Sequence, residues 1–329
     1  MRRSTMKGSW AVVLALTSAL GLVAAACGDD DGGGDDGSGT TQVRLILGWV
    51  ASPQFGGFFA AQQQGYYEDV GLEVVLEGGE VESPIQVVAA GGAEFGFGDA
   101  DELLQARSQG IPIVGVFPTF QKALRILAYH EEEPVTSFES LDGRDVFVDL
   151  GDAWWEFVKV KYSLNDVRER SYSQQAFLRD DAAVIQGYAG DQLELSSADP
   201  SAEFGVLNVA DSGWNPYMQV LFVSESYAEE NPDRIKDFID ASVRGWEYYQ
   251  ENFHDVHVYM QDQGAEADPE VMDQIAELYE EYIFEGGFPA EMDAGRWQDT
   301  LEALQLTGVL DEDVDVDVSA AFSNEYLRS

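Results

Sequence analysis

Apolar residues from position 43 onward recur with two different spacings, and this change of spacing predicts strands that alternate with helices. Residues 43–50 form a short apolar run rich in branched side chains, as in a buried strand. A helical repeat of Phe and Gln follows and stops at Gly65, before a second apolar run at 72–76. A strand, a helix and a strand within about 35 residues predict a βαβ unit with a parallel sheet.

The same alternation continues along the first third of the chain. Ser83 is the expected cap of a second helix, residues 95–97 form a third strand, and Asp99 or Asp101 caps the helix after it. Ligands of open parallel sheets bind beyond the carboxyl ends of the strands. We therefore expect a binding site at the loop 49–55 and at the two aspartates.

The strand and helix pattern starts again after residue 129 and predicts a second lobe. Strands are expected at 145–150, near 171–173, at 182–190 and at 206–209, with a helix at 154–164. A strand at 218–223 returns to the first lobe, and the helices after 231 are expected to pack there. The predicted lobes are 41–129 with 217–329, and 130–216. The chain then crosses between them near 128–134 and near 214–219, and two crossings make a hinge.

The first 40 residues read as an export signal and a tether. Basic residues precede an apolar run at 10–26 that ends in small side chains before Cys27. This predicts a lipoprotein signal peptide at 1–27 with lipidation at Cys27, and an extracytoplasmic protein anchored to the outer face of the cell membrane. An uncleaved transmembrane anchor is the alternative, because the run approaches the length of a span. Residues 28–40 consist mostly of Gly and Asp and predict a solvated acidic tether.

The charge of the chain excludes several partners. It carries 18 basic and 61 acidic side chains, a formal net charge of −43. Nucleic acid and anionic lipid head groups are therefore poor partners for its surface. Adaptation to a salty exterior would explain the acidity, and so would a general acidic bias of the source organism.

Few residues offer catalytic or metal chemistry. Cys27 is the only cysteine, so no disulfide is expected, and no nucleophile-elbow, phosphate-loop or zinc-protease pattern occurs. His254 and His257 are three residues apart on a predicted helix and could approach one metal ion, although both lie far from the expected cleft. We predict no catalytic residue, no cofactor and no resident metal.

The predicted strand ends instead combine flat rings with a few polar groups, which suits a ring-shaped ligand. We expect about half of the rings to reach the ligand, with Trp49 and one of the two adjacent tryptophans stacking on it. Lys122 and Arg125 are the only nearby cations, so a neutral or weakly basic heteroaromatic fits better than an anion. The candidate ligand contacts are Trp49, Gln54, Phe55, Asp99, Asp101, Gln121, Trp154, Trp155, Tyr188, Trp214 and Tyr217.

Several short motifs also carry a family resemblance, which is dense between residues 45 and 121. They are Trp49, Pro53-Gln54-Phe55, Gly65-Tyr66-Tyr67, Gly71-Leu72, Gly78-Gly79, Phe95-Gly96, Asp101-Glu102-Leu103 and Gly110-Ile111-Pro112-Ile113, with Gly245-Trp246 and Trp297 later in the chain. Together they resemble the NMT1/THI5-like family of solute-binding proteins, which serve ABC importers of thiamine pyrimidine precursors, riboflavin and related compounds.

The resemblance implies an α/β, two-lobed type II periplasmic-binding-protein fold with two hinge crossings. It further implies a monomer that delivers a small molecule to a membrane permease, with a thiamine pyrimidine precursor as the favoured ligand. Riboflavin-type and sulfonate- or nitrate-type binding proteins are the alternatives. Some relatives synthesise the pyrimidine with clustered cysteines, which are absent after Cys27. An enzyme is therefore the less favoured interpretation.

Overall fold

The computed structural model describes residues 40–79, 83–284, 287–289, 291–314 and 316–327. The predicted signal peptide, the lipidation site at Cys27 and nearly all of the tether lie outside the described residues. Within these ranges no helix combines the length and the apolar character that a membrane span requires.

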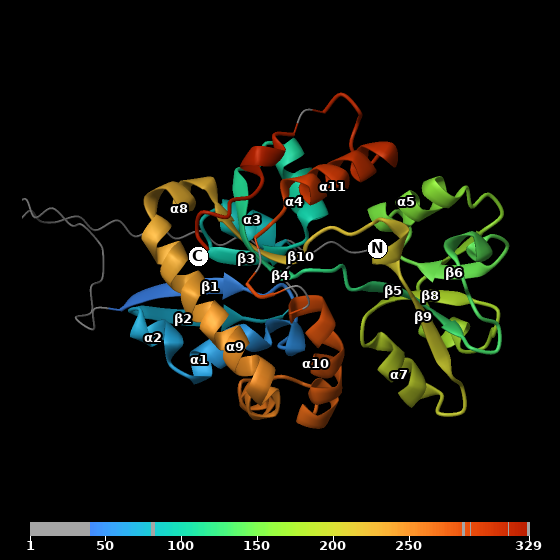
Figure 1. The fold of residues 1–329 in the computed structure, drawn as a ribbon, viewed down its shortest axis with the longest axis horizontal. Coiled ribbons are helices and arrows are strands. Elements are labelled where there is room, and N and C mark those ends of the chain that lie inside the picture. Colours follow the sequence, from blue (N-terminus) through green and yellow to red (C-terminus); the bar gives the residue numbers. More distant parts are fainter. Residues whose placement is uncertain (1–39, 80–82, 285–286, 290, 315, 328–329) are drawn as a thin grey trace, which may run out of the picture. The chain divides into compact units, whose positions relative to one another are not determined.

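The first lobe is built on a five-stranded sheet with the strand order β2-β1-β3-β10-β4 (Figure 1). β1 pairs in parallel with β2 and β3, whereas β10 is antiparallel to both β3 and β4. The parallel part is the predicted βαβ arrangement, because helices connect these strands. The strands are β1 (Thr41–Ile46), β2 (Leu72–Glu77), β3 (Phe95–Gly98), β4 (Ile113–Phe120) and β10 (Met218–Ser224).

Helices cover both faces of this sheet, and α3 and α4 begin at the caps that the sequence predicts (Figure 1). The Ser83 hydroxyl accepts a hydrogen bond from the Gln86 amide at 3.3 Å, with Pro84 in the first turn, so the predicted cap is present. The helices of this lobe are α1 (Gly56–Gln63), α2 (Tyr66–Asp69), α3 (Pro84–Ala89), α4 (Ala100–Ser108), α8 (Glu225–Glu230), α9 (Pro232–Asp262), α10 (Pro269–Phe284) and α11 (Ala294–Leu306), with 3-10 turns η1 (Pro53–Phe55) and η4 (Val318–Ala320).

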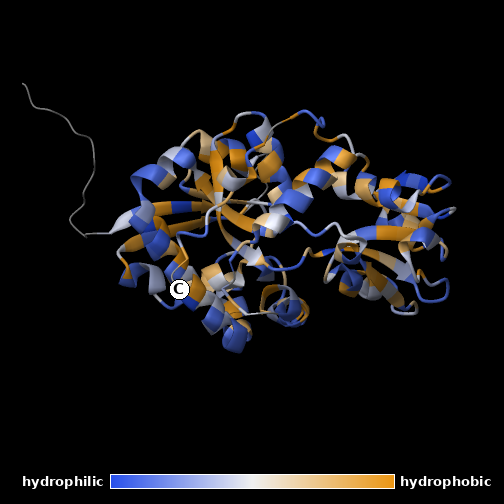
Figure 2. Cartoon of the chain, turned by 45° about the horizontal axis from the view of Figure 1, so that its top comes forward, coloured by the Kyte–Doolittle hydropathy of each residue, from blue (hydrophilic) through white to orange (hydrophobic). Residues whose placement is uncertain are grey.

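Close packing of α1 against α9 depends on two glycines. A Cβ atom at Gly245 would lie 2.1 Å from the Gly57 carbonyl oxygen, so a side chain there would force the two helices apart. Around this contact Phe58, Phe238 and Trp246 are fully buried. Figure 2 shows apolar residues concentrated on the strands, with hydrophilic residues on the outer faces of the helices. The aromatic core therefore fixes the sheet whose strand ends carry the predicted site.

The second lobe repeats the first strand order, as β7-β6-β8-β5-β9. β6 is parallel to β7 and β8, and β5 is antiparallel to β8 and β9. Its strands are β5 (Arg125–His130), β6 (Asp145–Val148), β7 (Arg168–Ser171), β8 (Val184–Tyr188) and β9 (Phe204–Asn208); its helices are α5 (Ala153–Tyr162), α6 (Gln174–Phe177) and α7 (Asp191–Ala198), with η2 (Phe138–Leu141) and η3 (Val209–Ser212).

β5 corrects one predicted boundary. The sequence assigned residues up to 129 to the first lobe, but β5 lies between β8 and β9 in the second sheet. The first crossing is therefore at residues 121–124, and the second is at 213–217. The prediction was late because the polar break at Gln121 and Lys122 is short, and local spacing does not show that the apolar residues after it join a different sheet.

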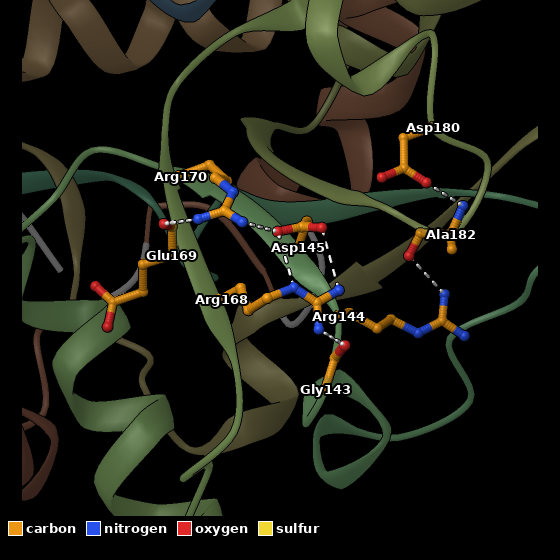
Figure 3. A network of polar contacts seen from close by, with 8 residues as sticks. All are labelled: Gly143, Arg144, Asp145, Arg168, Glu169, Arg170, Asp180 and Ala182. Atoms are coloured by element: carbon orange, nitrogen blue, oxygen red, sulfur yellow. Dashed lines mark hydrogen bonds and ion pairs between the residues drawn. The ribbon is translucent and has the colours of Figure 1, made fainter.

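Charged side chains cover β7, the edge strand of the second sheet (Figure 3). The Arg168 guanidinium donates to both Asp145 carboxylate oxygens at 3.1 Å, and Arg170 pairs with the same carboxylate at 2.8 Å. These two arginines lower the pKa of Asp145, with the Arg168 hydrogen bond as the largest cause. Exposed charges of this kind discourage another strand from pairing with the edge.

The C-terminal helices extend beyond the first lobe, where the sequence placed them. α11 contacts α4 of the first lobe and α5 of the second. Its Trp297 and Leu304 are buried in the same apolar cluster as Trp155 of α5. In α10, the Tyr282 hydroxyl donates to the Asn208 side chain of the second lobe at 3.0 Å. Helical spacing showed which residues of these helices are buried, but not that two lobes share the buried face.

Candidate ligand-binding cleft

A cavity of about 430 Å³ lies where the two lobes and both crossing segments meet. The N-terminal turn of α4 provides one wall, which we call the carboxylate wall: Asp99, Asp101 and Glu102. The opposite side, the aromatic wall, consists of Trp154, Tyr188 and Trp214. Arg125 and Asp152 also line the cavity. A site at the carboxyl ends of the strands is the expected position in open α/β sheets.

The carboxylate wall is held in place by the backbone. β3 ends at Gly98, and the Asp99 amide donates to the Glu102 carboxylate at 3.0 Å as α4 begins. The Gln219 amide of β10 donates to Asp99 Oδ1 at 2.9 Å. Asp99 therefore caps its helix and ties it to β10, while Asp101 and Glu102 face the cavity from the first turn.

Burial raises the pKa of the two aspartates of this wall. It raises the pKa of Asp99 well above its usual range, and repulsion by Glu102 and Asp101 raises it further. Burial, and then repulsion by Glu102, raises the pKa of Asp101 to about 7. Near neutral pH this wall thus contains both carboxylic acid and carboxylate. It can donate hydrogen bonds to a ligand as well as accept them.

Arg125 lies against the aromatic wall. Its guanidinium carbon is 4.7 Å from the centre of the Tyr188 ring and 5.3 Å from that of Trp154. Nη2 donates to the Tyr188 hydroxyl at 2.9 Å, and Nη1 lies 3.8 Å from Asp152 Oδ2. The same Asp152 oxygen accepts a hydrogen bond from Trp154 Nε1 at 3.2 Å. The cation thus covers the faces of two rings that turn toward the cavity.

Five of the predicted contacts meet around this cavity, from both lobes and from the second crossing. Strand ends provide Asp99, Asp101 and Tyr188, a helix start provides Trp154, and the crossing provides Trp214. The cavity also contains residues that sequence reasoning did not name as contacts. Asp152 precedes a predicted helix as a capping residue would, and Glu102 stood beside the named aspartates. The missed residues include Glu102, Arg125, Asp152 and Met218.

Three predicted rings belong to the core and do not line the cavity. Phe55 is fully buried and packs on Phe97 with ring centres 5.4 Å apart. Trp155 is fully buried because adjacent residues of a helix point about 100° apart, so that only Trp154 can face the cleft. The Tyr217 hydroxyl accepts from the Asp293 amide at 2.8 Å, and its ring lies under Arg296. These three assignments are therefore corrected.

The remaining predicted contacts, Trp49, Gln54 and Gln121, do not line this cavity. Trp49 is 53% exposed in the loop after β1. Gln54 is partly buried in η1, and Gln121 is partly buried at the start of the first crossing. The Gln121 amide donates to the Tyr282 carbonyl at 2.7 Å. Whether these three reach a ligand stays a prediction.

Both crossings are bound by one arginine of α11. Arg296 donates to the carbonyl of Gln121 in the first crossing and to those of Asn215 and Pro216 in the second, the last at 2.8 Å. Its guanidinium lies 3.9 Å from the centre of the Tyr217 ring. The Asn215 side chain also accepts from the Ala123 amide at 2.9 Å, which ties the crossings to each other. Burial lowers the pKa of Arg296 from its usual value.

The histidine pair considered for a metal is engaged elsewhere. His254 Nδ1 and His257 Nδ1 lie 2.6 Å and 2.7 Å from the two carboxylate oxygens of Asp273. His257 Nε2 lies 2.7 Å from the Tyr249 hydroxyl, within the packing of α9 against α10. In the part of the chain that the structure describes, no three His, Cys, Asp or Glu side chains are grouped to hold a metal ion.

Solved structures with a similar fold include periplasmic binding proteins. The sulfonate-binding protein SsuA of Methylobacillus flagellatus superposes with a TM-score of 0.66 at 11% identity and covers 88% of this chain and 93% of its own. The aliphatic sulphonate binding protein SsuA of Escherichia coli gives a TM-score of 0.63 at 13% identity, with 88% and 94% coverage. The predicted two-lobed periplasmic-binding-protein fold is thereby confirmed.

Relatives in sequence include both binding proteins and enzymes. The riboflavin-binding protein RibY of Chloroflexus aurantiacus is 25% identical over 308 residues, 87% of this chain and 86% of that protein. The formylaminopyrimidine-binding protein of Halalkalibacterium halodurans is 23% identical over 226 residues, 64% and 67% of the two chains. A 4-amino-5-hydroxymethyl-2-methylpyrimidine phosphate synthase of Aspergillus parasiticus is 21% identical over 228 residues, with the same coverage. The family model described as NMT1/THI5 like matches residues 52–253, so the chain belongs to the NMT1/THI5-like family.

Proposed function

We propose that this protein is the solute-binding component of an ABC importer and that it captures a flat nitrogen heteroaromatic between its lobes. The observation that carries the proposal is the cavity with a carboxylate wall on one lobe and rings on the other, bridged by two short crossings. Rings and convergent polar groups are typical of small-molecule sites. Relatives named for binding riboflavin and a formylaminopyrimidine support the same ligand class.

A thiamine pyrimidine precursor is the first candidate ligand. Its amino group would donate to a carboxylate of Asp99 or Asp101, and a protonated carboxyl could donate back to a ring nitrogen. Such a pair of hydrogen bonds needs an acid and a base on one wall, which the raised pKa values of these residues supply. Sulfonate and nitrate fit less well, because the ionised fraction of the carboxylate wall repels an anion.

Riboflavin is the second candidate, favoured by the size of the cavity. The cavity volume of about 430 Å³ exceeds what a single pyrimidine ring fills and is in the range of pockets for drug-sized ligands. The relative with the greater coverage of this chain is the riboflavin-binding one, at 87%. The ribityl hydroxyls would meet the carboxylate wall, and the ring system would occupy the opposite side.

Closure of the lobes would bring Trp49 to the ligand. β1 and β6 occupy the same place in the matching strand orders of the two sheets, and we infer that the loops after them approach each other when the lobes close. Trp49 follows β1 and is 53% exposed, and Leu150 follows β6 and is 59% exposed. A ligand that touches both lobes shifts the population toward the closed form, in which these side chains become buried. Small-angle scattering tests this, since saturating ligand should compact the protein.

Export and anchoring complete the proposal. We infer that the chain is lipidated at Cys27, acts outside the cytoplasm as a monomer, and passes its ligand to a membrane permease. The support is the lipoprotein-type signal, together with periplasmic-binding-protein neighbours in structure. Metabolic labelling with palmitate should mark the wild type, whereas Cys27→Ser should carry no label and leave the membrane fraction.

Enzymatic synthesis of the pyrimidine is the alternative function. It is supported by the relatives that are phosphate synthases. The sequence speaks against it, because its only cysteine is Cys27, in the predicted signal. Incubating the purified protein with the cofactors of such enzymes discriminates between the two, since a product would overturn the binding function.

Calorimetric titration tests the ligand class directly. We expect the wild type to bind 4-amino-5-hydroxymethyl-2-methylpyrimidine or riboflavin, and not taurine or nitrate. Trp49→Ala should weaken binding at least about fivefold, because one stacked ring contributes about 1 kcal/mol. Leu306→Ala is the matched control, since Leu306 is equally exposed, at 56%, at the end of α11. A wild type that binds only the anions would refute the ligand class.

A further inference from the structure

Arg125 is the cation of the cleft whose hydrogen bonds are least used by the protein. A guanidinium has five N–H donors. Among the described residues, only the Tyr188 hydroxyl accepts a hydrogen bond from Arg125, at 2.9 Å, while Asp152 lies beyond hydrogen-bond distance at 3.8 Å. Arg296 differs, because it donates to three backbone carbonyls and one side chain. Arg125 therefore retains donors for another partner.

The position of Arg125 directs these donors into the cleft. It is the first residue of β5 and stands opposite Tyr188 in the antiparallel register with β8. Its side chain is 16% exposed and lines the cavity. The guanidinium carbon lies 4.7 Å from the centre of the Tyr188 ring and 5.3 Å from that of Trp154, so the two rings support the guanidinium plane. A planar cation supported in this way loses little freedom when it binds a ligand, and its fork suits a flat acceptor edge.

The two sides of the cavity are therefore opposite in hydrogen-bonding character. Asp99, Asp101 and Glu102 offer mainly acceptors, and Arg125 offers only donors. Attraction by Arg125 lowers the pKa of both aspartates, although burial outweighs it, so the opposed charges interact across the cavity. A ligand that fills this space needs hydrogen-bond donors at one end and acceptors at the other.

We propose that Arg125 binds a carbonyl acceptor on the ligand and thereby selects heteroaromatics that carry such a carbonyl at one edge and N–H or O–H donors at the opposite end. This inference rests on the proposed binding function and narrows its ligand class. A bare anion lacks donors for the carboxylate wall, and an aminopyrimidine without a carbonyl leaves the guanidinium unpaired. In either case polar groups of the cavity lose water without gaining a hydrogen-bond partner, and a ligand that has the carbonyl and the donors avoids this cost.

The test is calorimetric titration with two neutral aminopyrimidines of which one carries a carbonyl: 4-amino-5-hydroxymethyl-2-methylpyrimidine and N-formyl-4-amino-5-aminomethyl-2-methylpyrimidine, with riboflavin as a second carbonyl-bearing probe. We expect the wild type to prefer the carbonyl-bearing ligands. Arg125→Met, which keeps an unbranched apolar stem, should weaken their binding about 10- to 100-fold, the range for hydrogen bonds to a charged group. Binding of the hydroxymethyl compound, which has no carbonyl, should change less than about threefold, as for loss of a weak charge interaction.

Two controls separate this effect from a structural one. Lys122→Met removes a cation three residues earlier that stands over Tyr282 and does not line the cavity, and it should leave all affinities unchanged. Arg125→Lys keeps the charge without the planar fork and should recover only part of the preference. Equal loss for both members of the pair, or none, would refute the role of Arg125. A wild type that binds no heteroaromatic would refute the proposed function itself.

Discussion

Replacing Asp101 by Asn should stabilise the empty protein at alkaline pH and not at acidic pH. Burial and the neighbouring Glu102 raise the pKa of this carboxyl from 3.8 to about 7. The folded state therefore binds a proton more tightly than the unfolded state does. As the pH rises from 4 to 7, the unfolded chain releases this proton first, so stability falls through this window and stays lower above it.

The size of the effect follows from the shift. About three pKa units correspond to about 4 kcal/mol at most. Because Asp101 is only partly buried, water reduces this cost. The carboxylate also lies in the first turn of α4, where a negative charge contributes about 0.3 to 1 kcal/mol that Asn loses. We therefore expect Asp101→Asn to gain about 1 to 3 kcal/mol above about pH 8.

Urea denaturation followed by tryptophan fluorescence measures this gain. The wild type and Asp101→Asn are compared at about pH 4 and about pH 8 at one ionic strength, because salt screens the other charges. Asp299→Asn on the exposed face of α11 removes the same charge from the surface and controls for the general repulsion of an acidic chain. A gain that does not depend on pH, or a loss at alkaline pH, would contradict the reasoning. The same variant should bind its ligand more weakly, as expected for a site that trades stability for binding.

Three further predictions concern the hinge, the core and the surface. Arg296→Met should lower the free energy of unfolding by about 2 to 4 kcal/mol, because it leaves carbonyl groups of both crossings without a hydrogen-bond donor. Arg296→Lys should lower it less. A urea midpoint of Arg296→Met equal to that of the wild type would show that Arg296 does not stabilise the crossings. Gly245→Ala should cost about 1 to 3 kcal/mol, since its Cβ would lie 2.1 Å from the Gly57 carbonyl oxygen; an unshifted thermal melt would show that the helices adjust freely. Molar salt should raise the melting temperature if the net charge of −43 is an adaptation to salt, and no change would argue for a general acidic bias.

Periodicity and turn residues were enough to predict most of the strands. Apolar runs gave β1, β2 and β3, and Ser83 marked the start of α3. β5 was missed because the polar break at Gln121 and Lys122 is too short to indicate that the chain leaves one sheet for another. Local spacing cannot show which sheet a strand joins, since that depends on partners distant in the sequence such as Tyr188.

The site was predictable in position but not in detail. Strand order places the ends of β3 and β8 at the cleft, which explains why Asp99, Asp101 and Tyr188 meet there. The choice between Trp154 and Trp155 depends on the rotation of α5, which two adjacent identical residues do not reveal. Arg125 was recognised only as a nearby cation, because its role depends on rings that come from other segments of the chain.

The contacts of α11 constrain how the protein can move. A hinge made only of two connecting strands would bend with little resistance, and each lobe would open independently of the C-terminal segment. Here a helix that follows both lobes in the sequence packs on each of them and grips the two connections through Arg296. Opening of the lobes must therefore slide or tilt α11, so the packing of this helix resists the hinge motion. Helix α11 can thus tune the affinity for a ligand in a cavity that none of its own residues lines.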